Sequence, residues 1–202
     1  RWVHPVTAEV SAALSRDSQG VCAVASADAV SRELPEPSMG ETLVVLAQGR
    51  DPGNVGTIIR TADAFGAVGV ITVSGTVEAT SPKVVRASAG SVFHIPVCSV
   101  SSFEEAHALI HRRSAALLGT SGGAGSLDLS QMLVQGVSGR SRLSQSHAWV
   151  FGNEAKGLSG AEMRLCDALV SIPMTGDAES LNVASAATAC LFASQTVRGM
   201  AL

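Results

Sequence analysis

Three short segments of the chain combine glycines with polar side chains of the types that bind ligands or take part in catalysis. They are residues 48–56, 152–157 and 173–182. Each follows an apolar run of strand length and precedes a run of helix length, so each is expected at the carboxyl end of a strand. In open α/β sheets, ligands bind in the crevice beyond those ends. The chemistry is therefore expected where the three segments meet.

The first segment leads into a predicted helix at residues 55–65. Asn54 occupies a position suited to an N-cap, whose side chain accepts a backbone N–H of the first turn. Arg60 lies off the predicted apolar stripe of the helix. It is therefore free to reach a ligand at the helix mouth, or to pair with Asp51 or Asp63.

Gly53 and Gly56 in the same segment would let the backbone approach a ligand closely. No G-x-G-x-x-G follows the strand, and the segment is not a Walker loop either. Neither of those nucleotide-binding loops is therefore indicated.

The second and third segments place a carboxylate, a hydroxyl and an amide at the same edge. Glu154 directly follows an apolar strand, so we expect it to be partly desolvated, with a raised pKa suited to proton transfer or to orienting a donor. The last predicted helix opens at Ser180 or Asn182, and both are good N-cap residues. Glu154 could also cap local backbone N–H groups, so a purely structural role stays open for all three.

The elements that must position these residues alternate between strand and helix. The strand-length runs are continuously apolar, as in strands covered on both faces. This predicts an α/β fold with a mostly parallel sheet and helices on both faces. The predicted strands are 43–47, 68–73, 93–97, 115–118, 149–151 and 168–172. The predicted helices are 55–65, 82–89, 103–113, 127–134, 159–165 and 182–197.

Residues 1–40 differ from this pattern. Two short helices are predicted there, at 7–14 and 26–33, followed by a linker at 34–40 in which two prolines exclude regular structure. The chain begins at Arg1 rather than Met, so we expect it to be part of a longer protein.

Composition narrows the classes of protein further. The 202 residues are 46% hydrophobic and only 15% charged, against roughly 25% charged in an average domain. This excludes disorder and indicates either a sheet buried on both faces or a surface covered by a partner subunit. No apolar run approaches the roughly 20 residues of a membrane helix, so we expect no membrane partner.

Charge and cysteine content limit the partners. The net charge of −3 has the wrong sign for bulk attraction to nucleic acid, so any RNA contact must be local. The four cysteines have no C-x-x-C spacing and no His at ligand distance, which indicates neither a metal site nor a disulfide framework. Reduced cysteines are typical of the cytoplasm, which is the expected location.

In this order on one sheet, the segments resemble the three signature motifs of the SpoU-type (TrmH) RNA ribose 2′-O-methyltransferases of the SPOUT superfamily. The resemblance runs from residue 43 to the C-terminus. The matching residues are Asn54-x-Gly56-x-x-x-Arg60, Gly152-Asn153-Glu154, and Ile172-Pro173-Met174 with Ser180-Leu181-Asn182-Val183.

This resemblance implies a C-terminal trefoil knot, a homodimer, and S-adenosylmethionine as the cofactor. Gly152, Ile172 and Leu181 match the cofactor positions of the family, and the loop with Thr120 and Gly122 is a further candidate. No metal is implied.

The resemblance also implies methyl transfer to a ribose 2′-hydroxyl. Arg60 would bind a phosphate of the target nucleotide and stabilise the developing alkoxide, since a guanidinium does not act as a base at working pH. Glu154 or that phosphate would take the proton. Asn54, Ser180 and Asn182 would orient the ribose and these partners.

RNA contacts are expected from basic residues in or beside the motif loops, although the same charges could be scattered and solvated. They are Arg50, Arg60, Lys83, Arg86 and Lys156. Residues 1–40 look like the end of an N-terminal RNA-binding domain plus its linker, and 41–202 like the catalytic domain. A chain of this extent is therefore expected to bind S-adenosylmethionine but to methylate RNA weakly.

The N-terminal segment favours rRNA over tRNA as the substrate. Two other classes stay open: a catalytically silent RNA-binding relative, and a generic doubly wound nucleotide-binding module.

Overall fold

The computed structural model describes residues 3–15, 19–123, 125–136 and 138–200. Its strands form one sheet in the order β3-β2-β1-β6-β4-β7-β5, and all neighbouring pairs are parallel. The predicted parallel α/β architecture is thus confirmed. The strands are β1 (Thr42–Leu46), β2 (Gly69–Val73), β3 (Val97–Val100), β4 (Ala116–Thr120), β5 (Leu127–Asp128), β6 (His147–Phe151) and β7 (Ala168–Ser171).

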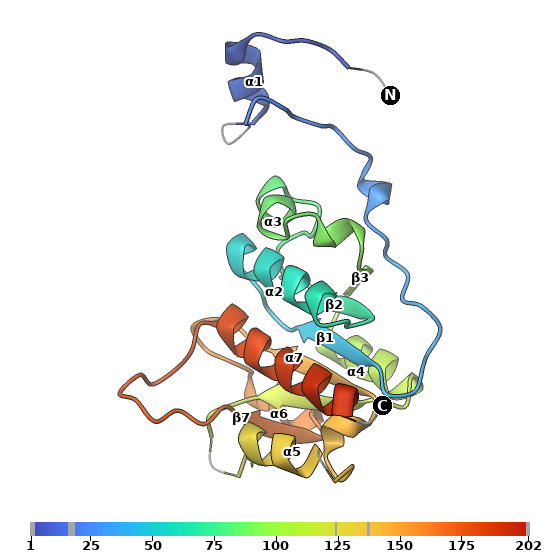
Figure 1. Ribbon diagram of the computed structural model, residues 1–202, viewed down its shortest axis with the longest axis vertical. Helices are drawn as coiled ribbons and strands as arrows, with labels where there is room; N and C mark the ends of the chain where they lie inside the picture. Colours follow the sequence, from blue (N-terminus) through green and yellow to red (C-terminus); the bar gives the residue numbers. More distant parts are fainter. Residues whose placement is uncertain (1–2, 16–18, 124, 137, 201–202) are drawn as a thin grey trace.

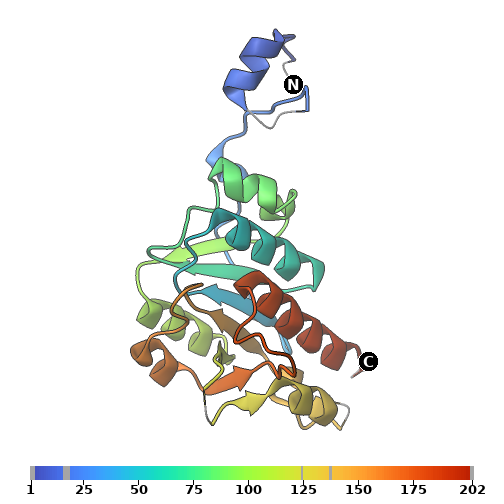
Figure 2. The same cartoon turned by 90° about the vertical axis from the view of Figure 1, so that its left-hand side faces the viewer.

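Helices cover both faces of the sheet, which gives three layers (Figures 1 and 2). One face carries α2, α5 and α7, and the other carries α4 and α6. The helices are α1 (Ala8–Leu14), α2 (Pro52–Ala64), α3 (Pro82–Ala87), α4 (Phe103–Arg112), α5 (Leu129–Gly136), α6 (Gly160–Leu165) and α7 (Val183–Met200).

Alternate residues of the central strands enter two separate cores. In β1, Val44 and Leu46 join the core beneath α2 and α7, whereas Leu43 and Val45 join the core beneath α4. The whole of β1 and β6 is buried, as their apolar runs at 43–46 and 149–151 predict. Thr42 and His147, the first residues of these strands, are buried polar residues.

The strand predicted at residues 93–97 is displaced toward the C-terminus. Residues Ser91–Phe93 form a short 3-10 helix, and β3 begins only at Val97. Pro96 lacks the N–H that a strand residue donates, and it bonds to β2 only through its carbonyl, which accepts the N–H of Val70 at 2.9 Å. The short edge strand β5 was not predicted, because two residues give no pattern.

Helices α2 and α3 pack unusually closely at Gly56. A Cβ placed there would lie 2.7 Å from the carbonyl oxygen of Val84 and would also contact Ala87. The interpretation that Gly56 lets a ligand approach is therefore wrong, because α3 occupies that space. The glycine fixes α3 against α2 instead.

A buried hydrogen-bond network ties α7 to β6. His147 Nδ1 faces the carbonyl of Gln145 at 2.7 Å, which requires a proton on Nδ1 and leaves Nε2 as an acceptor. Ser194 Oγ lies 2.7 Å from His147 Nε2 and accepts a hydrogen bond from Trp149 Nε1 at 2.8 Å. Burial lowers the pKa of His147 to about 4.

Residues 30–41, which we call the strap, run along the domain rather than forming a free linker. Val30 is only 5% exposed, and the carbonyl of Ser31 accepts a hydrogen bond from Val97 of the edge strand β3 at 2.8 Å. The helix predicted at 26–33 is reduced to the 3-10 turn Ala27–Ala29, because the chain extends here to pair with β3.

A buried ion pair anchors the end of the strap. Arg113 binds both carboxylate oxygens of Glu41, from Nε at 2.7 Å and from Nη2 at 2.9 Å. Its Nη1 donates to the carbonyl of Pro35 at 2.8 Å. The segment 34–40 is irregular, as its prolines predict, but it is held firmly in place.

Beyond the strap, α1 lies past α3 at one end of the molecule and contains no buried residue (Figure 1). In the described ranges, no helix has the length and apolar character needed to cross a membrane. Nor do these ranges contain a group of three or more His, Cys, Asp or Glu that could hold a metal ion. The C-terminal trefoil knot stays a prediction.

Candidate functional site

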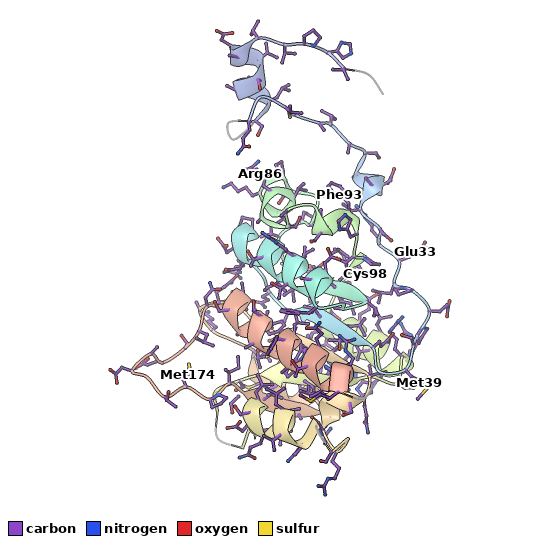
Figure 3. The ribbon with its side chains drawn as sticks, viewed as in Figure 1. Glu33, Met39, Arg86, Phe93, Cys98 and Met174 are labelled. Atoms are coloured by element: carbon purple, nitrogen blue, oxygen red, sulfur yellow. The ribbon has the colours of Figure 1, made fainter. Side chains whose placement is uncertain are left out.

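A cavity of about 450 Å³ lies at the carboxyl ends of β4, β6 and β7. Its lining comes mainly from the three loops that follow these strands, at 120–122, 152–158 and 172–183. Figure 3 shows Met174 on the last of these loops, which protrudes from the domain. All five predicted cofactor-binding residues line this cavity: Thr120, Gly122, Gly152, Ile172 and Leu181.

The loop after β6 is closed by its own backbone. Asn153 donates its N–H to the carbonyl of Gly157 at 3.1 Å, and Gly157 donates in return at 2.8 Å. A Cβ at Gly152 would collide with the backbone of Gly157, so this tight loop requires glycine there. Gly152 therefore allows the tight loop that places Glu154 at the cavity wall.

Glu154 joins this loop to the start of α2. Its Oε1 accepts the backbone N–H of Asp51 at 3.3 Å. The side chain lines the cavity, but the residue is exposed, so the expected desolvation is absent. Its carboxylate is open to a ligand in the cavity.

The N-cap of α2 is Asp51, not Asn54 as predicted. Asp51 Oδ1 accepts the N–H of Asn54 at 2.8 Å, and Pro52 follows at the first helical position. Asp followed by Pro is a start signal that could have identified this cap from the sequence. Asn54 lies inside the first turn, so its side chain is released from capping.

Asn182 caps α7 and also contacts the first segment. Its Oδ1 accepts the backbone N–H of Ala184 at 2.8 Å, and its Nδ2 donates to Asn54 Oδ1 at 3.0 Å. Ser180 is exposed and lines the cavity instead of capping the helix. Hydrogen bonds therefore connect the first segment with both of the others.

Arg60 lies apart from this cluster. It is exposed and off the buried stripe of α2, as predicted. It is also six residues beyond Asn54, about 9 Å along the helix, and is not among the cavity's lining residues. Among the described residues it has no ion-pair partner: Asp63 pairs with His94, and Asp51 caps α2.

The other predicted RNA-binding residues do not gather at one mouth. Arg50 is exposed directly before the N-cap of α2, and Lys156 lines the cavity described above. Lys83 and Arg86 line a different cavity, beside α3.

The lining suits S-adenosylmethionine. Glu154 and Glu179 contribute two carboxylates and Lys156 one ammonium, so the charge balance favours a cationic sulfonium. Apolar side chains such as Leu158 and Leu181 offer surfaces for a purine ring, and the volume falls in the usual range for small-molecule sites. Sequence reasoning did not single out Leu158, Met163 or Glu179.

Comparison with known proteins agrees with this geometry. Residues 41–192 match the model of the SpoU rRNA Methylase family. The chain is 42% identical over 146 residues to a 23S rRNA (uridine(2479)-2′-O)-methyltransferase of Streptomyces viridochromogenes, covering 70% of this chain and 47% of that protein. It is 34% identical over 200 residues to the 23S rRNA (guanosine-2′-O-)-methyltransferase RlmB of Bordetella pertussis, covering 96% of this chain and 78% of that protein.

Among solved structures, the SpoU methyltransferase AviRb of Streptomyces viridochromogenes in complex with AdoMet superimposes with a TM-score of 0.68. Its sequence is 35% identical, and the match covers 86% of this chain and 64% of that one. The chain therefore belongs to the SpoU rRNA methylase family. It spans about half the length of the Streptomyces relative.

Proposed function

We propose that this protein transfers a methyl group from S-adenosylmethionine to a ribose 2′-hydroxyl of rRNA. The observation that carries the proposal is the cavity at the ends of β4, β6 and β7, which gathers residues from two of the three motif segments. The third segment is hydrogen-bonded to its edge through Asp51 and Asn54. The names of the Streptomyces and Bordetella relatives support rRNA as the substrate.

The bound cofactor supplies a methyl group on a positively charged sulfur. Gly152, Ile172 and Leu181 would hold it in the cavity, together with the loop at 120–122. The carboxylate of Glu154, open at the cavity wall, would take the proton of the 2′-hydroxyl. As the new O–CH₃ bond forms, the S–CH₃ bond breaks, and S-adenosylhomocysteine leaves with the bonding electrons.

The remaining polar residues would position the RNA. Asn54 can donate from Nδ2, because its Oδ1 is engaged by Asn182. Ser180 would contact the ribose from the opposite loop. Arg60 would bind a phosphate of the target nucleotide and stabilise the developing alkoxide.

Within one chain, Arg60 does not line the cavity at the ends of β4, β6 and β7, which we call the methyl-transfer cavity. In a homodimer, Arg60 of one protomer would reach the methyl-transfer cavity of the other. Arg60 is exposed on α2, and the neighbouring helix α7 exposes 53% of Phe192, an apolar surface that a second copy would cover. Mixing two inactive variants tests this idea. Arg60→Ala and Leu181→Arg would each be inactive alone, and mixed dimers would regain activity. A mixture of dimers as inactive as its components would contradict a shared site.

We assign the described part of residues 1–40 to the end of an RNA-binding unit, and propose that the C-terminal segment forms a trefoil knot. Free cysteines in the described ranges are compatible with the cytoplasm as the location.

The proposed activity is tested by mapping ribose methylation in total RNA from cells with and without the full-length gene. A 2′-O-methyl group blocks alkaline cleavage at its nucleotide, so one position in rRNA should lose its protection in the deletion strain. Loss of methylation at a tRNA position instead would identify tRNA as the substrate. Unchanged methylation, together with no binding of S-adenosylmethionine, would identify a silent RNA-binding relative.

A further inference from the structure

A second and larger cavity, of about 900 Å³, lies between the N-terminal segment and α3. Lys83, Arg86 and Phe93 line its domain side, and residues 22–27 line the other. Figure 3 shows Arg86 and Phe93 at the end of the domain that faces α1. We call this space the α3 cavity. It shares no lining residue with the methyl-transfer cavity.

The α3 cavity is basic although the chain as a whole is acidic. Lys83 and Arg86 contribute two cations to the lining, and Arg86 also has an interaction within the chain. The chain has a net charge of −3 and contains only two lysines, one of which faces this cavity and the other the methyl-transfer cavity. The local charge favours an anionic ligand such as a phosphate group.

An exposed aromatic ring lies among these charges. Phe93 is 45% exposed, although the chain contains few aromatic residues and most of its large apolar side chains are buried. A ring in an open, positively charged cavity is the combination on which proteins stack the bases of single-stranded nucleic acid. An acidic peptide would use the cations but would not need the ring.

The position of the cavity also suits an RNA that reaches the methyl-transfer site. Helix α2 packs tightly on α3 through Gly56 and carries Asn54 two residues earlier. The two sites are therefore held in a fixed relation by one helix. Figure 3 shows Arg86 at the end of the domain that faces α1 and Met174 on the protruding loop that precedes α7.

We propose that the α3 cavity binds a single-stranded segment of the RNA substrate, with a base stacked on Phe93 and its phosphates bound by Lys83 and Arg86. The inference rests on the proposed function for the identity of the substrate. It adds a second RNA contact, which holds the molecule while its target ribose lies in the methyl-transfer cavity.

Fluorescence anisotropy with a labelled single-stranded RNA of about 12 nucleotides tests the stacking contact. Phe93→Leu keeps the apolar volume but removes the ring, so affinity should fall about tenfold. Phe93→Tyr restores a ring and should recover most of that loss. Equal affinity of Phe93→Leu and the wild-type chain would overturn the stacking contact.

The salt dependence of the same binding tests the phosphate contacts. Lys83→Gln and Arg86→Gln should each make the slope of log K against log salt shallower by about 0.7, the value for one phosphate of a single strand. Arg142→Gln, an exposed arginine on the 3-10 turn Arg142–Ser144, is the matched control and should keep the wild-type slope. Unchanged slopes in both test variants would show that Lys83 and Arg86 do not bind phosphates of the RNA.

A footprint on the unaltered chain needs no substitution. Cys22 is exposed and lines the α3 cavity, whereas Cys98 and Cys166 are half-buried and Cys190 is buried. The RNA should slow alkylation of Cys22 by iodoacetamide. Equal alkylation rates with and without RNA would contradict the proposal. Protection by polyglutamate as strong as that by RNA would assign the cavity to an acidic protein instead.

These outcomes are separable from a failure of the proposed function. Calorimetry with S-adenosylmethionine and methyl transfer to rRNA report on the other cavity. A chain that binds RNA through Phe93 but transfers no methyl group would retain this inference and lose the proposed activity. If the chain methylates rRNA but Phe93→Leu binds the RNA probe as tightly as the wild type, the proposed activity is retained and this inference is lost.

Discussion

Asn182 Nδ2 donates a hydrogen bond to Asn54 Oδ1 at 3.0 Å, across 128 residues of sequence. The direction of this bond is set by the cap of α7, because Asn182 Oδ1 already accepts the backbone N–H of Ala184. Asn54 must therefore present its oxygen to Asn182. Its own NH₂ group is left to donate elsewhere, and the adjoining cavity edge is where an RNA oxygen would meet it.

Replacement of Asn54 separates these two roles. Asn54→Asp keeps an oxygen for Asn182 Nδ2 and suits the first turn of a helix, so the melting temperature should stay within a few degrees of the wild type. The variant loses both N–H donors, and kcat should fall at least about tenfold. Asn54→Ala, which loses both roles, should be slower and less stable. Full activity of Asn54→Asp would contradict donation by this amide.

Glu154 can be tested with an isosteric change. Glu154→Gln retains an oxygen that accepts the N–H of Asp51, so the loop after β6 should keep its position. It removes the proton acceptor, and kcat for methyl transfer should fall by about 10² to 10⁴ while the affinity for S-adenosylmethionine changes little. A loss of less than about tenfold would assign proton transfer to a phosphate of the RNA.

The ion pair between Glu41 and Arg113 predicts how firmly the strap is attached. Both side chains are almost fully buried, so removing one partner leaves an uncompensated charge. Glu41→Gln or Arg113→Met should lower the free energy of unfolding by about 3 to 5 kcal/mol in urea titrations. Cleavage of residues 30–41 by a protease should become faster.

The double variant Glu41→Leu/Arg113→Leu provides the control for this prediction. It buries no charge, so it should recover a large part of the lost stability. Single variants as stable and as protease-resistant as the wild type would show that the strap is held by its other contacts alone.

Because His147 is buried with a lowered pKa, the folded state should lose stability in mild acid. Its pKa is about 4 in the fold because burial disfavours the charged ring, while the unfolded chain titrates near 6.5. The unfolded state therefore binds more protons between these values, and stability falls as the pH falls through this window. From about pH 7.5 to about pH 5, the free energy of unfolding should drop by about 2 kcal/mol on this account.

Arg198 on α7 faces the same ring and adds to the unfavourable energy of its charged form. His147→Gln should be less stable at neutral pH but should show a shallower pH dependence than the wild type. Equal slopes for His147→Gln and the wild type would show that His147 does not cause the pH dependence.

Much of the fold follows from local pattern. The runs that became β1 and β6 are continuously apolar, and such strands are buried on both faces. Pro96 moved the start of β3, although an apolar run preceded it. The docking of the strap could not be predicted, because it depends on Arg113 reaching Glu41 from a helix end 72 residues away.

The candidate site was also only partly predictable from the sequence. Gly152, Ile172 and Leu181 could be placed in one cavity, since carboxyl ends of neighbouring parallel strands share an edge. The exposure of Glu154 could not, because it depends on how the loop after β6 closes on Gly157. Arg60 lies six residues beyond Asn54 along α2 and is not among the residues that line the cavity.

Isothermal titration calorimetry with S-adenosylmethionine tests the central claim most directly. The wild-type chain should bind one molecule per chain. Leu181→Arg should abolish binding, because Leu181 lines the cavity yet is 43% exposed, so the fold tolerates a larger and positively charged side chain there. Arg142→Gln should bind like the wild type. No heat of binding from the wild-type chain, or equal binding by Leu181→Arg, would contradict a methyl-donor site in this cavity.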